Sequence, residues 1–191
     1  MDKKKASSQK VALIIGISGQ DGALLTKFLL KKSYKVVGQS RSIDSFNNKN
    51  LKFLGLEKNV DIKFTSLFKI EDVESLINES NPDEIYNFSG QTSVGLSYRN
   101  PIETANSHVT STLNILSAIR NINLNIKFFN AGSGEVFGNI DNNTADENTP
   151  FNPVSPYGAS KASSTHFTSV YRESYNMFTC TGIFFNHESG M

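Results

Sequence analysis

Residues 11–22 read VALIIGISGQDG, and this stretch decides the fold class. Val11 to Ile15 is an apolar run of strand length that leads directly into a glycine-rich turn. Apolar residues then recur at helical spacing, at Leu24, Leu25, Phe28 and Leu29. A second strand-like run follows from Tyr34 to Val37. The pattern predicts one complete strand-helix-strand unit, which is the building block of a parallel sheet.

Three glycines, Gly16, Gly19 and Gly22, lie three residues apart between the predicted strand and the predicted helix. Glycine lets the backbone turn sharply and approach a pyrophosphate without a Cβ in the way, and the following helix N-terminus offers free N–H groups. We therefore expect a dinucleotide to bind at this turn. The alternative is a tight turn that needs glycine for steric reasons only, but the flanking strand and helix favour binding.

The rest of the chain repeats this alternation of strand-like and helical segments. Four more strands are predicted, at Ile62 to Thr65, Glu84 to Phe88, Ile126 to Asn130 and Thr179 to Phe185. Three more helices are predicted, from Glu71 to Asn78, around Leu113, Leu116 and Ile119 with an end near Arg120, and from about Pro156 to Tyr175. The polar segment Gly138 to Pro156 predicts a long surface loop near the site. Together they predict an α/β fold with a doubly wound parallel sheet, a Rossmann fold of order 3-2-1-4-5-6.

Composition and charge restrict the class of protein. The 191 residues, 38% of them hydrophobic, are enough for one domain with a core. A net charge of +1 does not favour nucleic acid as a partner, and no apolar run approaches the roughly 20 residues that cross a membrane. The single cysteine, Cys180, forms no internal disulfide, which favours the cytoplasm. Its apolar surroundings predict a buried structural thiol.

The chain divides simply. Residues 1–10 are polar and are expected to form a flexible tail, whereas residues 11–191 are expected to form one NAD(P)-binding domain. No internal repeat and no interdomain linker is recognisable.

The cofactor preference depends on the residues that follow the second strand. Sites that prefer NAD often have an acidic residue there, which holds the ribose hydroxyls. This chain has Gln39, Ser40 and Arg41 instead. The planar guanidinium of Arg41 can pair with a 2′-phosphate, which favours NADP over NAD. A solvated surface arginine is the alternative.

Tyr157 and Lys161 lie four residues apart, which places both side chains on one face of the predicted helix. A phenol normally titrates near pH 10, so its use as a base at neutral pH needs a nearby positive charge. Lys161 and an oxidised nicotinamide ring can supply that charge. Such a pair is common in helices for structural reasons, but its position behind a dinucleotide turn favours catalysis.

Ser133 and Glu135 follow the fifth predicted strand, at the sheet edge where open parallel sheets bind ligands. A serine hydroxyl there can hydrogen-bond a substrate hydroxyl, and a glutamate can move protons. A turn serine and a helix-capping or solvated glutamate are the structural alternatives.

With these motifs in place, the sequence resembles the GDP-mannose 4,6-dehydratase family of the extended short-chain dehydrogenases. The turn from Gly16 to Gly22 contains the distinctive Gly-Gln-Asp-Gly of that family. Other matching segments are Ser45-Phe46-Asn47, Ile85-Tyr86-Asn87 leading to Gly90-Gln91, Pro150-Phe151, Ser155 to Lys161, Tyr171 to Asn176 and Phe185 to Ser189. The resemblance covers about Val11 to Ser189, almost the whole chain.

The resemblance implies a role for each catalytic candidate. Ser133 would orient the sugar, Glu135 would act as acid and base, and Tyr157 would be the base for oxidation. Lys161 would bind the nicotinamide ribose and lower the pKa of Tyr157. The implied cofactor-binding residues are Gly16, Gly19, Gln20, Asp21, Gly22, Arg41, Ser66, Leu67, Gln91, Tyr157, Lys161 and His187.

The implied activity is that of an NADP-dependent lyase of nucleotide-sugar metabolism. GDP-mannose would be converted into GDP-4-dehydro-6-deoxy-mannose, a precursor of GDP-fucose, by transient hydride transfer to NADP⁺. Members of the family associate through helices, so a homo-oligomer is expected of the full-length protein. No metal is expected.

The sequence also departs from the family. Ser66 stands where an acidic residue usually holds adenine, and Ser42 stands where a second arginine would support NADP. The chain ends at Met191, before most of the family's C-terminal substrate domain. We therefore expect a truncated chain without most contacts to GDP-mannose. Another sugar-nucleotide epimerase or dehydratase, or a non-catalytic dinucleotide-binding fragment, remains as an alternative.

Overall fold

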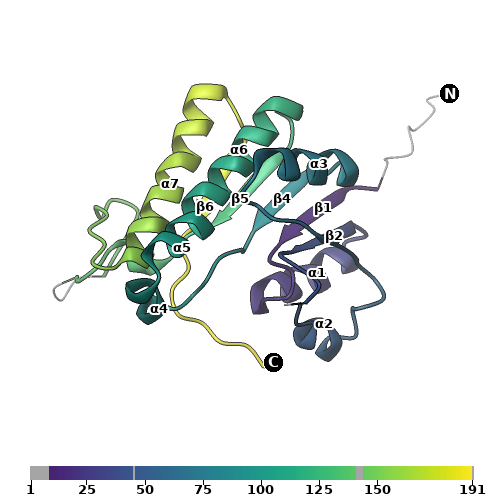
Figure 1. Cartoon of the computed structure of the whole chain (residues 1–191), viewed down its shortest axis with the longest axis horizontal. Helices are drawn as coiled ribbons and strands as arrows, with labels where there is room; N and C mark the ends of the chain where they lie inside the picture. The colour runs from purple at the N-terminus through teal and green to yellow at the C-terminus, as the bar shows by residue number, and fades with distance from the viewer. Residues whose placement is uncertain (1–8, 45, 141–143, 191) are drawn as a thin grey trace.

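Six parallel strands form a single sheet in the order β3-β2-β1-β4-β5-β6 (Figure 1). The structure, a computed structural model, describes residues 9–44, 46–140 and 144–190, so most of the expected N-terminal tail lies outside the described residues. The strands are β1 (Val11–Ile15), β2 (Lys35–Ser40), β3 (Asp61–Phe64), β4 (Glu84–Asn87), β5 (Lys127–Ala131) and β6 (Thr179–Gly182). The predicted strand order is confirmed.

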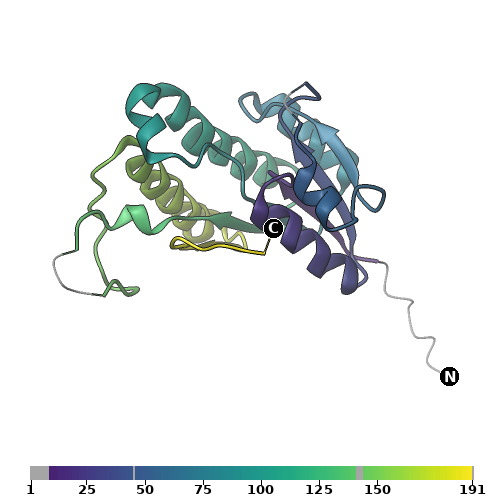
Figure 2. The same ribbon diagram turned by 90° about the horizontal axis from the view of Figure 1, so that it is seen from below.

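Helices cover the two faces of the sheet unequally (Figures 1 and 2). The helical elements are α1 (Gln20–Lys31), α2 (Lys49–Phe53), α3 (Ile70–Ser80), α4 (Val94–Arg99), α5 (Pro101–Ala105), the π-helix η1 (Asn106–Thr110), α6 (Ser111–Ile122), the 3₁₀-helix η2 (Gly134–Val136) and α7 (Pro156–Tyr175). The long helices α3, α6 and α7 lie side by side on one face, while α1 and α2 lie on the other.

The first strand shows why both faces are buried. Leu13 and Ile15 point into the core beneath α3 and α6, whereas Ala12 and Ile14 point into the core beneath α1 and α2. All four side chains are buried. A central parallel strand faces apolar layers on both sides, and this explains the uninterrupted apolar run in the sequence.

Two of the predicted helices agree closely with the structure. The last helix has the predicted bounds, since Ser155 caps its N-terminus by accepting a hydrogen bond from the Gly158 N–H, and Asn176 ends it in the left-handed conformation. Helix α3 is slightly longer than the predicted helix from Glu71 to Asn78. It is ended by Asn81, whose backbone is also in the left-handed conformation. Local capping chemistry explains both ends.

Other elements differ from the sequence-based prediction. The helix around Leu116 is preceded without a break by α5 and η1, so helical backbone runs from Pro101 to Ile122. The short helices α2 and α4 were not predicted, because five or six residues carry too little periodicity to be recognised. The sixth strand ends at Gly182 and not at Phe185, since its neighbour in the sheet, β5, ends at Ala131.

Cys180 is exposed, so the predicted burial of its thiol was wrong. It lies opposite Phe129 in the register of the edge strand β6. Phe129 packs against Phe88 and Phe184. These rings lie on the same face of the sheet as α1, but α1 covers the other half of that face. An apolar run at an edge strand therefore does not guarantee burial.

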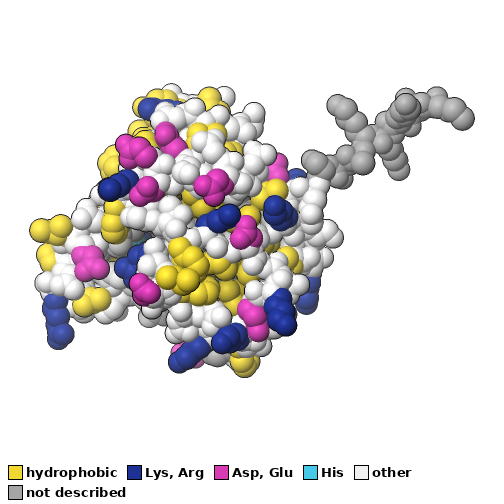
Figure 3. Space-filling view, turned by 45° about the vertical axis from the view of Figure 1, so that its right-hand side comes forward, with side chains coloured by type: hydrophobic (Ala, Val, Ile, Leu, Met, Phe, Trp, Pro, Cys, Tyr) yellow, Lys and Arg dark blue, Asp and Glu magenta, His cyan; other side chains and the backbone are white. Residues whose placement is uncertain are grey.

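One face of the molecule mixes apolar and charged side chains (Figure 3). Figure 3 shows apolar side chains gathered near the middle of this view, with basic and acidic side chains around them. Phe64 of the edge strand β3 is exposed, and its ring packs edge-on against Phe46. Among the described residues, no helix is long and apolar enough to cross a membrane.

The turn between β1 and α1 is fixed by two close backbone approaches. Gly16 has φ +79°, and a Cβ there would lie 2.8 Å from the Phe88 carbonyl oxygen. A Cβ on Gly22 would lie 2.6 Å from the Gly16 carbonyl oxygen. Only glycine fits at both positions, so the first turn of α1 can pack directly on the end of β1.

We predict that Gly16→Ala destabilises the fold by about 2–4 kcal/mol, since it combines a left-handed conformation with a backbone clash. Gly55→Ala is the matched control, because Gly55 has φ +66° but no atom within 4 Å of its would-be Cβ. That control should cost only about 1 kcal/mol. Urea unfolding of both variants measures the difference. Equal losses would show that the clash at Phe88 contributes nothing.

Candidate active site

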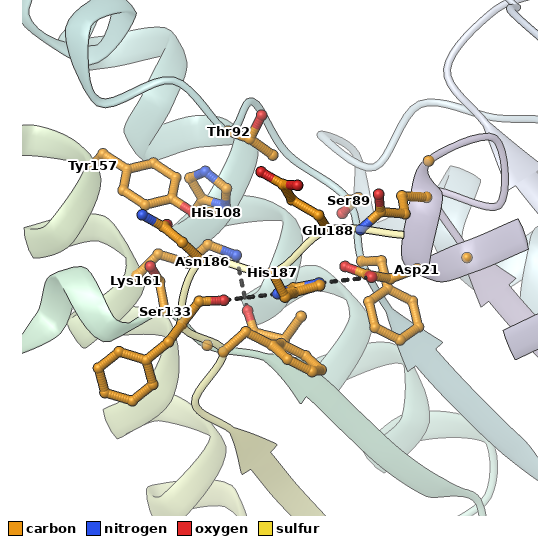
Figure 4. A pocket seen from close by; sticks show the side chains of 18 residues that line it. Asp21, Ser89, Thr92, His108, Ser133, Tyr157, Lys161, Asn186, His187 and Glu188 are labelled. Carbon is orange, nitrogen blue, oxygen red and sulfur yellow. Dashed lines mark hydrogen bonds and ion pairs between the residues drawn. The ribbon is translucent and has the colours of Figure 1, made fainter. Parts of the chain in front are cut away.

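A cavity of about 850 Å³ opens at the carboxyl edge of the sheet (Figure 4). Its wall includes the turn after β1, the segment after β4 and the segment after β5. The strand order reverses between β1 and β4, which is where open α/β sheets bind ligands. The topology therefore brings three distant parts of the sequence to one site.

The first turn of α1 forms one end of the cavity. Gly19, Gln20, Asp21 and Gly22, four of the residues predicted to bind a dinucleotide, line it. Gly19 precedes the helix, and the first backbone N–H groups of a helix have no partner within that helix. This end of the cavity suits a negatively charged group such as a pyrophosphate.

The segment after β6 crosses the cavity and contacts the same turn. Figure 2 shows this C-terminal segment running toward α1. His187 Nε2 lies 2.8 Å from an Asp21 carboxylate oxygen, and the Ser189 hydroxyl donates a hydrogen bond of 2.9 Å to Gln20 Oε1. The Phe185 carbonyl and the Asp21 carboxylate raise the pKa of His187. His187 thus lines the cavity next to the predicted phosphate turn.

The N-terminal part of α7 forms the opposite wall, where Tyr157 and Lys161 meet Ser133 (Figure 4). Tyr157 is 8% exposed and Lys161 is 7% exposed. The Lys161 ammonium donates a hydrogen bond of 2.8 Å to the Ala131 carbonyl, so it is anchored at the end of β5. The three predicted residues are therefore brought together where α7 packs on β6 and η2.

The charges at this wall are set by burial. Burial raises the pKa of Tyr157, and a hydrogen bond with Ser133 partly offsets this rise. Burial also lowers the pKa of Lys161 to about 8. The Lys161 nitrogen lies 5.9 Å from the centre of the Tyr157 ring and donates its hydrogen bond to the Ala131 carbonyl. The family resemblance implied a lowered pKa for Tyr157, but the pKa is raised. In this geometry burial dominates the pKa of Tyr157.

Glu135 lies at the border of the site. It sits in η2, its side chain is exposed, and it does not line the cavity. Its backbone N–H donates to the Ser133 hydroxyl at 3.3 Å, and its negative charge contributes to the raised pKa of Tyr157. Glu135 is thus near the phenol, although its carboxylate faces solvent.

Apart from Gly16, which lies at the end of β1, four predicted cofactor residues do not line the cavity. Arg41 is exposed after β2, and Ser66 is exposed after the neighbouring strand β3, where it lines a smaller cavity of about 250 Å³ with Asp72 and Glu79. Leu67 is buried in the main core beneath α3. Gln91 is turned away, because its amide donates to Thr104 and accepts from the Ser93 N–H.

His108 is a cavity residue that the sequence did not reveal. It lies in η1, is 3% exposed, and its ring packs edge-to-face on Tyr157 with 5.3 Å between ring centres. Burial, together with the Lys161 charge, lowers its pKa to about 3. A single histidine inside a helical apolar pattern gives no signal, since its placement depends on the π-turn.

We predict that His108 makes the fold less stable as pH falls from 7 to 5. The folded protein keeps His108 neutral down to a pKa of about 3, whereas the unfolded chain takes up a proton near pH 6.5. The wild type should therefore lose about 2 kcal/mol more than His108→Gln over this range. Urea unfolding at several pH values tests this, with the exposed His166→Gln as control. Parallel curves for wild type and His108→Gln would contradict it.

Comparisons with known proteins identify the family. A family profile described as GDP-mannose 4,6 dehydratase matches residues 13–191. GDP-mannose 4,6 dehydratase 1 of Arabidopsis thaliana is 39% identical over 98% of this chain and 55% of that protein. The human GDP-mannose 4,6 dehydratase is 37% identical over 98% of this chain and 53% of that protein. The chain thus spans about half the length of the curated relatives it matches.

Solved structures share the fold. UDP-glucose 4-epimerase of Thermus thermophilus, in complex with NAD, is 28% identical with a TM-score of 0.79, over 87% of this chain and 52% of that one. A dTDP-glucose 4,6-dehydratase of Bacillus anthracis, also in complex with NAD, is 22% identical with a TM-score of 0.78, over 95% and 56%. On the match over residues 13–191, the chain belongs to the GDP-mannose 4,6-dehydratase family.

Proposed function

We propose that this chain carries the cofactor-binding and catalytic half of a GDP-mannose 4,6-dehydratase, an NADP-dependent lyase. The observation that carries the proposal is the meeting of Ser133, Tyr157 and Lys161 at the cavity that also receives the glycine turn. Membership of the family supplies the substrate class. GDP-mannose is accordingly the proposed substrate, and GDP-4-dehydro-6-deoxy-mannose the proposed product.

The cavity fits a nicotinamide dinucleotide. Cβ atoms at Gly16 and Gly22 would fill the space in which the turn packs, and the N-terminus of α1 faces the cavity. NAD is bound in the solved epimerase of Thermus thermophilus. When bound, the nicotinamide accepts a hydride from the sugar and later returns it. Arg41, which follows β2, favours NADP by its ability to pair with a 2′-phosphate.

Tyr157 and Ser133 act on carbon 4 of the mannose in the proposed reaction. Ser133 holds the carbon 4 hydroxyl, and Tyr157 takes its proton as the hydride leaves carbon 4. Because burial raises the pKa of Tyr157, the phenol needs positive charge nearby to act as a base at neutral pH. Lys161, held by the Ala131 carbonyl at the same wall, orients the nicotinamide ribose and contributes such charge.

Glu135 acts on the neighbouring carbons. The new carbonyl at carbon 4 acidifies the proton on carbon 5, which Glu135 removes and then delivers to the departing carbon 6 hydroxyl, so that water leaves. Return of the hydride to carbon 6 would be matched by addition at carbon 5 of the proton that Tyr157 took from the carbon 4 hydroxyl, and this completes the product. The atoms balance as GDP-mannose to GDP-4-dehydro-6-deoxy-mannose plus water, with no net use of cofactor.

The exposure of Glu135 favours one alternative, a sugar-nucleotide 4-epimerase. Epimerisation needs the serine, tyrosine and lysine but no acid-base group at carbon 5, and Glu135 does not line the cavity. The product distinguishes the two reactions, because an epimerase retains the carbon 6 hydroxyl.

We predict that Tyr157→Phe and Glu135→Gln each reduce the formation of GDP-4-dehydro-6-deoxy-mannose by about 10²- to 10⁴-fold, as expected for a lost acid-base group. Incubation with NADP⁺ and GDP-mannose, followed by product separation, measures this. Tyr175→Phe is the matched control, since Tyr175 lies at the other end of the same helix and outside the cavity. Unchanged turnover in Tyr157→Phe would refute the assignment.

The cofactor preference gives a separate prediction. Arg41→Gln should weaken NADP⁺ binding by about 10-fold or more, since a charge-assisted hydrogen bond to the 2′-phosphate is lost. NAD⁺ binding should stay the same. Calorimetric titration with both dinucleotides tests this, with Arg120→Gln on the distant helix α6 as control. Equal losses for NADP⁺ and NAD⁺ would mean that Arg41 does not select the 2′-phosphate.

For the whole protein we propose a homo-oligomer that works in the cytoplasm. Apolar side chains of α4, α5 and α7, namely Tyr98, Ile102 and Val170, are exposed and suit contact with a second copy. The single cysteine, Cys180, forms no internal disulfide, as is usual in a reducing compartment.

A further inference from the structure

His108 stands apart from the catalytic residues named above because the proposed reaction gives it no role. It is nevertheless a buried titratable side chain that lines the cavity next to Tyr157 (Figure 4). A buried polar ring beside a catalytic phenol either fills space or holds the phenol in place. Its contacts favour the second role.

The imidazole is anchored by a hydrogen bond to the backbone. His108 Nε2 lies 2.9 Å from the Gln91 carbonyl oxygen, which can only accept, so Nε2 carries the proton. Gln91 is itself fixed, because its side-chain amide donates to the Thr104 hydroxyl and its side-chain oxygen accepts from the Ser93 N–H. The ring therefore has a defined tautomer and a defined partner.

The backbone is adapted to admit this ring. Gly90 has φ +115°, and a Cβ there would overlap His108 Cε1. His108 also lies in the five-residue π-turn η1, which continues into α6. Such turns within helices often occur at functional sites because they redirect a side chain. A glycine and a π-turn thus both serve the placement of one imidazole.

The free face of the ring contacts Tyr157 directly. The two rings lie edge-to-face, at 86° with 5.3 Å between their centres, which is a favourable aromatic geometry. The charged group that acts on His108 is Lys161, which also lies over the Tyr157 ring. The phenol also interacts with the Ser133 hydroxyl and with the charge of Glu135. Tyr157 thus contacts both a neutral ring and its catalytic neighbours.

We propose that His108 is a positioning residue for Tyr157: its neutral imidazole, anchored to the Gln91 carbonyl, holds the phenol at the cavity wall in the orientation that abstracts a proton. This role rests on the proposed function of Tyr157 as the base. It extends that function to a side chain that reaches the reaction only through Tyr157.

The test starts with the cofactor-free chain labelled with ¹³C at tyrosine Cζ, with Tyr157→Phe to assign the Tyr157 signal. In the wild type the phenol should titrate above its ordinary range, since it is buried. In His108→Ala the titration should move toward the ordinary phenol value, because the ring gains solvent and freedom. His166→Ala is the matched control. His166 lies on the same helix as Tyr157 but away from it, and it also contacts an aromatic ring, that of Phe151.

The outcomes separate this role from the dehydratase assignment. A Tyr157 titration that is the same in wild type and His108→Ala overturns the positioning role, whatever the activity. If His108→Ala does not fold, His108→Asn removes the ring but keeps an N–H donor for Gln91, and the same criterion applies. Where turnover is measurable, kcat should fall about 10- to 100-fold with little change in the KM for GDP-mannose. A shifted titration without turnover in any variant supports positioning and refutes the proposed function alone.

Discussion

The rest of the site depends on the close approach of backbone at the turn between β1 and α1. Gly16 lies against the Phe88 carbonyl at the end of β4, and Gly22 lies against the Gly16 carbonyl. These contacts bring the N-terminus of α1 to the point where the strand order reverses. The cavity, its anion-attracting end and the position of α1 all follow from this single steric condition.

Burial then determines the chemistry of the opposite wall. Tyr157 and Lys161 are almost fully buried, so each is biased toward its neutral form, with the Lys161 pKa at about 8. His108 is neutral beside them for the same reason. With its pKa at about 8, Lys161 still carries its positive charge at neutral pH. The Tyr157 phenol stays protonated there, so proton abstraction by Tyr157 depends on the positive charge that surrounds it.

The C-terminal segment connects the two walls. His187 contacts Asp21 and Ser189 contacts Gln20, so residues that lie more than 160 positions apart are neighbours at the phosphate turn. Glu188 lines the cavity between them. Two segments that resemble the family, Gly19 to Gly22 and Phe185 to Ser189, thus belong to one surface.

The sequence by itself determined the alternation of strands and helices, the strand order, the bounds of α7 and the meeting of Ser133, Tyr157 and Lys161. These follow from local periodicity, capping residues and the rule that parallel strands share a carboxyl edge. Only the tertiary structure decided the burial of His108, the exposure of Cys180 and Glu135, and the direction of the Tyr157 pKa. Each of these depends on which residues from distant segments surround a side chain, and no local pattern encodes that environment.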